Sequence, residues 1–233
     1  MTVTRTTLKN LPAHRKRSLT AGLLYLLTFV SIPTLALYTQ VKSANYILGG
    51  GSDTSAIIGA ILEVTVAFAG IATAVVLFPM LKKQNESAAL GLVAARTVES
   101  ASILVGVAFL MTIVTLHQTG AGVASLPVSH ALAALYDRMF LLSQSFMPAI
   151  CDLLLGFMLY KSRLVPRRLA MIGIAGGPLL LVGYFLVMTG VLEQHSSAAG
   201  LTSIGVAVFE FSLGVWLVVK GFNPKAVAAL EKK

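Results

Sequence analysis

Long apolar segments alternate with short polar segments along nearly the whole chain. An α-helix needs about 20 apolar residues to cross the roughly 30 Å hydrocarbon core of a bilayer. The connections are short and hold breakers such as Gly49 to Gly51 and Pro127, which we place in the linker before the fourth span. The pattern predicts an all-α integral membrane bundle of six transmembrane helices, at residues 19–39, 56–81, 88–116, 135–160, 168–191 and 199–220.

The composition supports a membrane protein. Hydrophobic residues make up 56% of the 233 residues, charged residues make up 12%, and the mean hydropathy is +0.84. These values exclude a disordered chain and an ordinary soluble enzyme. The first apolar segment follows basic residues, as in a signal peptide, but it runs on to Tyr38 and therefore predicts a retained helix. We divide the chain into a basic N-terminal tail (1–18), a six-helix transmembrane domain (19–221) and a basic C-terminal tail (222–233).

The Lys and Arg residues lie almost entirely on one side of the predicted spans. Basic residues are retained on the cytoplasmic side of a membrane. On the opposite side lies only Lys42, and Arg96 and Arg138 fall within spans. The other fifteen are Arg5, Lys9, Arg15, Lys16, Arg17, Lys82, Lys83, Lys161, Arg163, Arg167, Arg168, Lys220, Lys225, Lys232 and Lys233. We therefore expect both termini in the cytoplasm, in a multi-pass protein of the plasma membrane. The net charge of +9 then reflects orientation and attraction to anionic lipid headgroups rather than nucleic-acid binding.

Ionisable residues inside the spans are the main candidates for a functional site. A charged side chain at the centre of a membrane helix costs about 2.5–3.5 kcal/mol, so such residues usually face the bundle interior. From helix rise, Glu99 and Glu210 lie near the midplane, with Arg96 and Asp152 somewhat nearer the cytoplasm. Glu63 belongs in the outer half. We group these five residues as a candidate intramembrane polar cluster.

Arg96 is the one cation deep in the predicted spans, against three carboxyls within reach. It is three residues from Glu99, so the two can pair on one helix face. We expect Arg96 to contact Glu99, Asp152 or Glu210. One guanidinium neutralises one or two carboxylates, so at least one acid should carry a proton at pH 7. Such a group is either part of a proton relay or a member of a static hydrogen-bonded core.

Other chemistry-bearing residues give weaker signals. The four histidines, His14, His117, His130 and His195, fall in the tail or in loops, and no motif for a nucleophile, a P-loop or a dinucleotide site is found. Cys151 is interpreted as a small apolar filler. We therefore expect no catalytic, metal or cofactor-binding residues and no cofactor. Gly173 and Gly177 predict a packing notch, within the chain or between copies, which leaves a homo-oligomer open.

Several segments resemble one family. They are Gly22 to Leu27, Arg96 with Glu99, the Leu159 to Arg167 loop, and Phe209-Glu210 followed by Gly214 to Leu217 and Lys220 to Phe222. On these motifs the chain resembles the bacterial multi-pass membrane family catalogued as domain of unknown function 4386. The resemblance implies a six-helix bacterial membrane protein with no established activity, and it places Arg96, Glu99 and Glu210 in matching motifs.

Three functions remain open. The first is a transporter of a small solute or ion, coupled to protons through the buried carboxyls; the absence of sequence repeats weighs mildly against it. The second is a non-catalytic membrane partner or sensor in which the buried ion pairs are structural. The third is a membrane enzyme acting on a lipid-soluble substrate, which the absence of a buried histidine and of a nucleophile motif disfavours.

Overall fold

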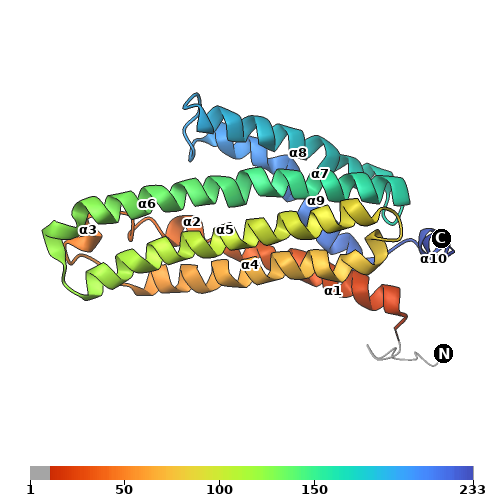
Figure 1. The fold of residues 1–233 in the computed structure, drawn as a ribbon, viewed down its shortest axis with the longest axis horizontal. Helices are drawn as coiled ribbons and strands as arrows, with labels where there is room; N and C mark the ends of the chain where they lie inside the picture. Colours follow the sequence, from red (N-terminus) through yellow and green to blue (C-terminus); the bar gives the residue numbers. More distant parts are fainter. Residues whose placement is uncertain (1–10, 233) are drawn as a thin grey trace.

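The computed structural model describes residues 11–232, and these residues form helices joined by turns, with no β-strand among them (Figure 1). Within them, six helical segments are long and apolar enough to cross a membrane, which confirms the predicted six-helix bundle. Arg5, Lys9 and Lys233, which belong to the predicted basic tails, lie outside the described residues.

The six spans closely follow the predicted apolar segments. The first span consists of α1 (Ala13–Thr28), a 3₁₀ turn (Phe29–Ser31) and α2 (Thr34–Leu37). The next two are α4 (Thr54–Leu81) and α5 (Glu86–Gln118). The fourth joins α6 (Leu126–Leu141), a π-helical turn (Leu142–Phe146) and α7 (Met147–Ser162). The last two are α8 (Arg167–Met188) and α9 (Ser197–Val219), and the short helices α3 (Ala44–Ile47) and α10 (Pro224–Glu231) lie outside the spans.

Two prolines explain where the helices differ from the prediction. The first span changes from α-helix to a 3₁₀ turn just before Pro33, which has no N–H for the helical ladder. The fourth span begins earlier than residue 135, because Pro127 lies in the first turn of α6. In a first turn the missing N–H has no intrahelical partner to lose. The placement of Pro127 in a linker was therefore wrong.

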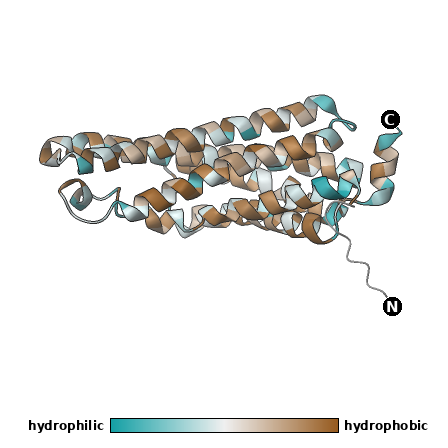
Figure 2. Ribbon diagram, turned by 90° about the horizontal axis from the view of Figure 1, so that it is seen from below, coloured by the Kyte–Doolittle hydropathy of each residue, from teal (hydrophilic) through white to brown (hydrophobic). Residues whose placement is uncertain are grey.

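Both described ends of the chain lie at the same end of the bundle (Figure 1). We call this the basic end; it also holds the α4–α5 turn at 82–85 and the α7–α8 turn at 163–166. The opposite, distal end holds α3 and the turn at 119–121, and the α8–α9 turn at 189–196 faces the same way but stops short of that end. In Figure 2 the sides of the helices are mainly hydrophobic and the hydrophilic residues gather at the ends. This distribution suits helices that stand across a bilayer.

The spans form a closed ring of neighbours. Along the sequence, α4 packs on α5, α5 on α6 and α7, α7 on α8, and α8 on α9, and α1 closes the ring between α4 and α9. At this closure Gly22 lies against the backbone of Gly214, where a Cβ atom would come within 2.7 Å of the carbonyl oxygen. A glycine is needed here because α1 and α9 approach at backbone distance.

The predicted packing notch at Gly173 and Gly177 is filled by side chains of the same chain. A Cβ atom at Gly173 would meet the ring of Phe209 on α9 at 2.7 Å, and one at Gly177 would meet Leu153 on α7 at 2.7 Å. The two glycines therefore let α8 pack closely against both of its neighbours.

Candidate functional site

Three helices bring four ionisable side chains together in the bundle interior. Arg96 and Glu99 come from α5, Asp152 from α7 and Glu210 from α9. At a rise of about 1.5 Å per residue, Arg96, Asp152 and Glu210 each lie about 14–15 Å from the basic end of their helix. This depth is near the middle of a hydrocarbon layer of about 30 Å. We call these four residues the Arg96 cluster.

Arg96 divides its hydrogen bonds between two carboxylates. Its Nη1 atom donates to both carboxylate oxygens of Glu99, at 2.9 and 3.1 Å, and its Nη2 atom donates to Oε1 of Glu210. The side chain of Arg96 is only 3% exposed, so these bonds form away from water. The guanidinium thereby links α5 to α9 through charge-assisted hydrogen bonds.

Asp152 is the third carboxyl, and its environment differs. Its Oδ1 atom lies 3.8 Å from Nη2 of Arg96, within ion-pair range but beyond a hydrogen bond. The residue is fully buried, and neither carboxyl oxygen has a hydrogen-bond partner among residues 11–232. A buried polar group without a partner is rare in proteins and marks a strained or functional position.

Two further side chains complete the surroundings of Arg96. The ring of Tyr25, on α1, lies 5.6 Å from the guanidinium carbon, at cation–π range. Cys151, fully buried, donates from Sγ to Oε2 of Glu99 at 3.4 Å. Cys151 is thus a donor to the cluster as well as a filler of the core. Tyr25 falls in the Gly22 to Leu27 segment that carries the family resemblance, but no sequence signal places it in the site.

The helix that carries Asp152 is irregular just before it. The π-helical turn at Leu142–Phe146 inserts wider backbone turns, and Pro148 follows in the first turn of α7. Single π-turns inside α-helices are frequent at functional sites. Pro148 has no N–H to donate to the preceding turn, so the helix here has fewer internal hydrogen bonds. The segment is therefore a point about which α7 can bend.

Glu63, which the sequence grouped with the other four residues, forms a separate site. Ser100 on α5 donates to the carbonyl of Ala67 on α4 at 2.7 Å, which fixes the register of these antiparallel helices. In this register Glu63 lies about 12 Å further toward the distal end than Arg96. Its oxygens accept hydrogen bonds from Tyr136 at 2.8 Å and Tyr38 at 3.2 Å. Sequence depth alone could not reveal these tyrosine donors.

Polar side chains connect the Glu63 site with the distal end. The ammonium of Lys42 lies 4.4 Å from the ring centroid of Tyr136 and pairs with Asp137 at 2.5 Å. Gln194, from the α8–α9 connection, donates to the carbonyl of Asp137 at 2.9 Å. Asp137 is partly exposed, as expected for a residue near the outer surface. A line of polar groups thus runs from the distal surface to buried Glu63.

A third polar site ties the distal ends of α3, α4 and α5 together. Asp53 precedes α4 and accepts hydrogen bonds from the Tyr46 hydroxyl at 2.6 Å and from Gln118 at 2.8 Å. Nδ1 of His117 lies 2.8 Å from the same carboxylate. The hydrogen bonds from Tyr46 and Gln118 hold the pKa of Asp53 below its usual range. Burial, with the neighbouring carboxylate, raises the pKa of Tyr46.

Among residues 11–232 no group of three or more His, Cys, Asp or Glu side chains is arranged to hold a metal ion. The Arg96 cluster offers a guanidinium and three carboxyls, with the thiol of Cys151 beside them, and these groups exchange hydrogen bonds and protons.

Comparison with known proteins places the chain by its sequence. No significant match was found among the curated proteins, and none among the solved structures. One family model, described as a domain of unknown function, matches residues 20–221. The match runs from α1 through the Arg96 cluster to the end of α9, and so covers every spanning helix. The chain belongs to the family of membrane proteins that share this domain, DUF4386.

Proposed function

We propose that this protein binds and releases a proton at Asp152, in the middle of the membrane, and couples this step to the movement of a small solute or ion. The observation that carries the proposal is the Asp152 carboxyl, which is fully buried and has no hydrogen-bond partner in residues 11–232. Intramembrane acids of this kind commonly belong to proton pathways.

The charge balance of the Arg96 cluster supports this role for Asp152. With Glu99 and Glu210 ionised, the single guanidinium of Arg96 already faces two negative charges. A third negative charge on Asp152 would have no hydrogen bond to stabilise it, and a buried unpaired charge is costly. Asp152 is therefore favoured in its neutral, protonated form while Arg96 is bonded to Glu99 and Glu210. Loss of that proton would favour a rearrangement that brings in another cation or water.

Two further features support movement of a proton. The π-helical turn and Pro148 lie directly before Asp152, so bending at this point would shift the carboxyl relative to Arg96. Glu63 with its two tyrosine hydroxyls provides a second buried acid nearer the distal end. Hydroxyl groups both donate and accept hydrogen bonds, so they suit proton transfer between the distal surface and the interior.

The same proposal includes the orientation. We place the basic end in the cytoplasm of a bacterium, with the protein in the plasma membrane, because the Lys and Arg residues concentrate there. The distal line of Lys42, Asp137 and Glu63 then faces the exterior, and protons would enter by this route.

A second candidate function is favoured by the tight closure of the Arg96 cluster. Arg96 is 3% exposed and Asp152 is 0% exposed, as in a static core that fixes how helices pack. In this alternative the protein is a non-catalytic membrane partner or sensor, and its ion pairs are structural. Protonation of Asp152 would then be permanent.

Infrared spectroscopy of the protein in proteoliposomes, with the spectrum of Asp152→Asn subtracted from that of the wild type at each pH, separates the two functions. A protonated carboxyl has its own C=O stretching band. We expect this band between about pH 5 and pH 9 in the wild type, its loss in Asp152→Asn, and its change when a transported solute is added. Panels of amino acids, sugars, organic acids and monovalent ions would be screened with a pH-sensitive dye inside the vesicles. No band at any pH would contradict the proposal, and a band that no pH or solute changes would support the structural alternative.

A further inference from the structure

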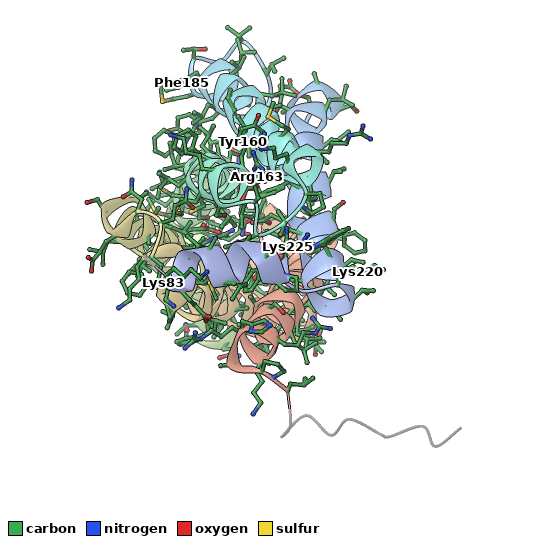
Figure 3. The ribbon with its side chains drawn as sticks, turned by 90° about the vertical axis from the view of Figure 1, so that its right-hand side faces the viewer. Lys83, Tyr160, Arg163, Phe185, Lys220 and Lys225 are labelled. Atoms are coloured by element: carbon green, nitrogen blue, oxygen red, sulfur yellow. The ribbon has the colours of Figure 1, made fainter. Side chains whose placement is uncertain are left out.

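A hollow of about 620 Å³ lies at the basic end, between two connections that are distant in sequence. One wall is the α7–α8 turn from Arg163 to Arg167, and the other is the α9–α10 connection from Lys220 to Pro224, with Trp216 beside it. Figure 3 looks onto this end: α10 lies across the helix ends, with Arg163 and Lys220 near its N-terminal end and Lys83 near its other end.

The two walls are held in place by backbone contacts. The N–H of Asn223 donates to the carbonyl of Leu164 at 2.8 Å. Leu164, Val165 and Phe222 are buried beneath the hollow and belong to the hydrophobic core. Arg163 ends α7 in the left-handed region, at φ 58°, which is unusual for a residue with a side chain. The hollow is therefore a defined part of the fold.

The charged residues that line the hollow are all basic: Arg163, Arg167 and Lys220. Arg167 stacks on the ring of Tyr160 at 4.8 Å. Arg163 and Lys220 have no side-chain hydrogen bond or ion pair within residues 11–232. The indole Nε1 atom of Trp216 is buried and has no acceptor in the same residues. The hollow thus gathers donors and positive charges that lack an acceptor.

We propose that this hollow binds the phosphate headgroup of an anionic phospholipid. Arg and Lys side chains donate charge-assisted hydrogen bonds to phosphate oxygens, and the Trp216 N–H supplies a further donor. The hollow lies where α7 and α9 end and α8 begins. In a bilayer the ends of spanning helices lie at the level of the lipid headgroups. Tryptophan is enriched at that level. The hollow is also lined by the apolar side chains of Pro166, Trp216 and Pro224, which fit the glycerol and upper acyl carbons of a lipid, and this favours a lipid over free phosphate.

The chain has one tryptophan, so its fluorescence reports directly on the hollow. The full-length protein would be placed in phosphatidylcholine nanodiscs that contain increasing amounts of phosphatidylglycerol, and native mass spectrometry would count retained lipids. We expect a saturable shift of Trp216 emission with phosphatidylglycerol. The double variant Arg163→Gln/Lys220→Gln should weaken the apparent affinity at least about tenfold, since it removes two of the three cations that line the hollow and that would pair with the phosphate.

Lys82→Gln/Lys83→Gln is the matched control, because it removes the same charge from the basic end outside the hollow. It should leave the shift unchanged, and Arg163→Lys should retain most of the binding. An equal loss in both double variants would overturn the proposal, as would an equal response to phosphatidylcholine and phosphatidylglycerol. Inorganic phosphate added to phosphatidylcholine nanodiscs should give no shift; a shift as large as that of phosphatidylglycerol would identify a free-phosphate site and exclude the lipid.

Discussion

The guanidinium of Arg96 is 2.9 Å from Glu99 but 3.8 Å from Asp152, so one acid is hydrogen-bonded to it and the other is not. Both acids are buried in the same cluster and differ only in their partners. In the proposed function, this difference separates the acid that neutralises Arg96 from the acid that exchanges a proton. It also determines how substitutions at the two positions should behave.

Removal of Arg96 should destabilise the bundle strongly. Arg96→Ala leaves Glu99 and Glu210 without their shared cation, and breaking a buried ion pair by removing one partner costs about 3–5 kcal/mol. Thermal unfolding in detergent, followed by circular dichroism, measures the effect. Arg168→Ala is the control, because Arg168 is exposed at the start of α8. Equal melting temperatures for the two variants would show that the ion pairs contribute nothing to stability.

The amide variants of the acids should fall into two groups. Asp152→Asn should change the free energy of unfolding by less than about 1 kcal/mol, because the neutral carboxyl and the amide have nearly the same shape and charge. Glu99→Gln removes the charge that faces Arg96 and should cost about 3 kcal/mol. Denaturation in mixed micelles compares the two. If Asp152→Asn were the more damaging change, Asp152 would be the ionised partner and the proposed proton site would be wrong.

The Asp53 site should make stability fall in acid. The pKa of Asp53 is lower in the folded protein than in the unfolded chain, chiefly through the Tyr46 hydrogen bond. Its contribution is therefore complete above the unfolded value of about 3.9 and is lost as the pH falls through the folded pKa. The melting temperatures of wild type and Asp53→Asn should differ at pH 7 and converge below about pH 4. A difference that stays constant down to pH 2.5 would refute this assignment, with Tyr46→Phe as a second variant that weakens the same bond.

The orientation is testable by cysteine labelling in a Cys151→Ser background, in which the serine hydroxyl still offers a donor to Glu99. Ser87 and Ser197 are exposed near opposite ends of the bundle. We expect Ser197→Cys to react with a membrane-impermeant maleimide in intact cells and Ser87→Cys to react only after lysis, because basic residues mark the cytoplasmic side. The reverse pattern would invert the proposed topology and the direction of the proton route.

The spans were predictable because membrane helices need a long apolar segment regardless of how they later pack. The effects of the prolines on the helices were harder to predict. Pro127 was interpreted as a linker residue, since a sequence does not show whether a proline falls in a first turn or between helices. Helix α10 was also missed, because it is short and begins at Pro224, in a segment that was assigned to a basic tail.

The Arg96 cluster was foreseeable in its members because a buried cation requires nearby acids. The geometry of the cluster could not be predicted. Arg96 donates hydrogen bonds to Glu99 and Glu210 but not to Asp152, and this choice depends on the register of three helices. The same holds for Glu63. Its position along the helix predicted its depth in the membrane, but its tyrosine hydrogen-bond donors come from α6 and from the segment after α2. The basic hollow joins residues more than 50 positions apart, and only the fold brings them together.

The contact between α1 and α9 has a consequence for biosynthesis. Arg15 donates to the carbonyl oxygens of Leu217 and Val218, so a residue made at the start of synthesis satisfies backbone groups made near its end. Glu210 likewise reaches Arg96 only from the last span. A nascent chain with five inserted helices therefore has an open seam beside α1, an exposed Gly22 face, and an arginine whose only carboxylate hydrogen bonds within the described residues are to Glu99. The ribosome must finish the sixth helix before the first one has its final neighbour, so the bundle closes after translation rather than helix by helix during it.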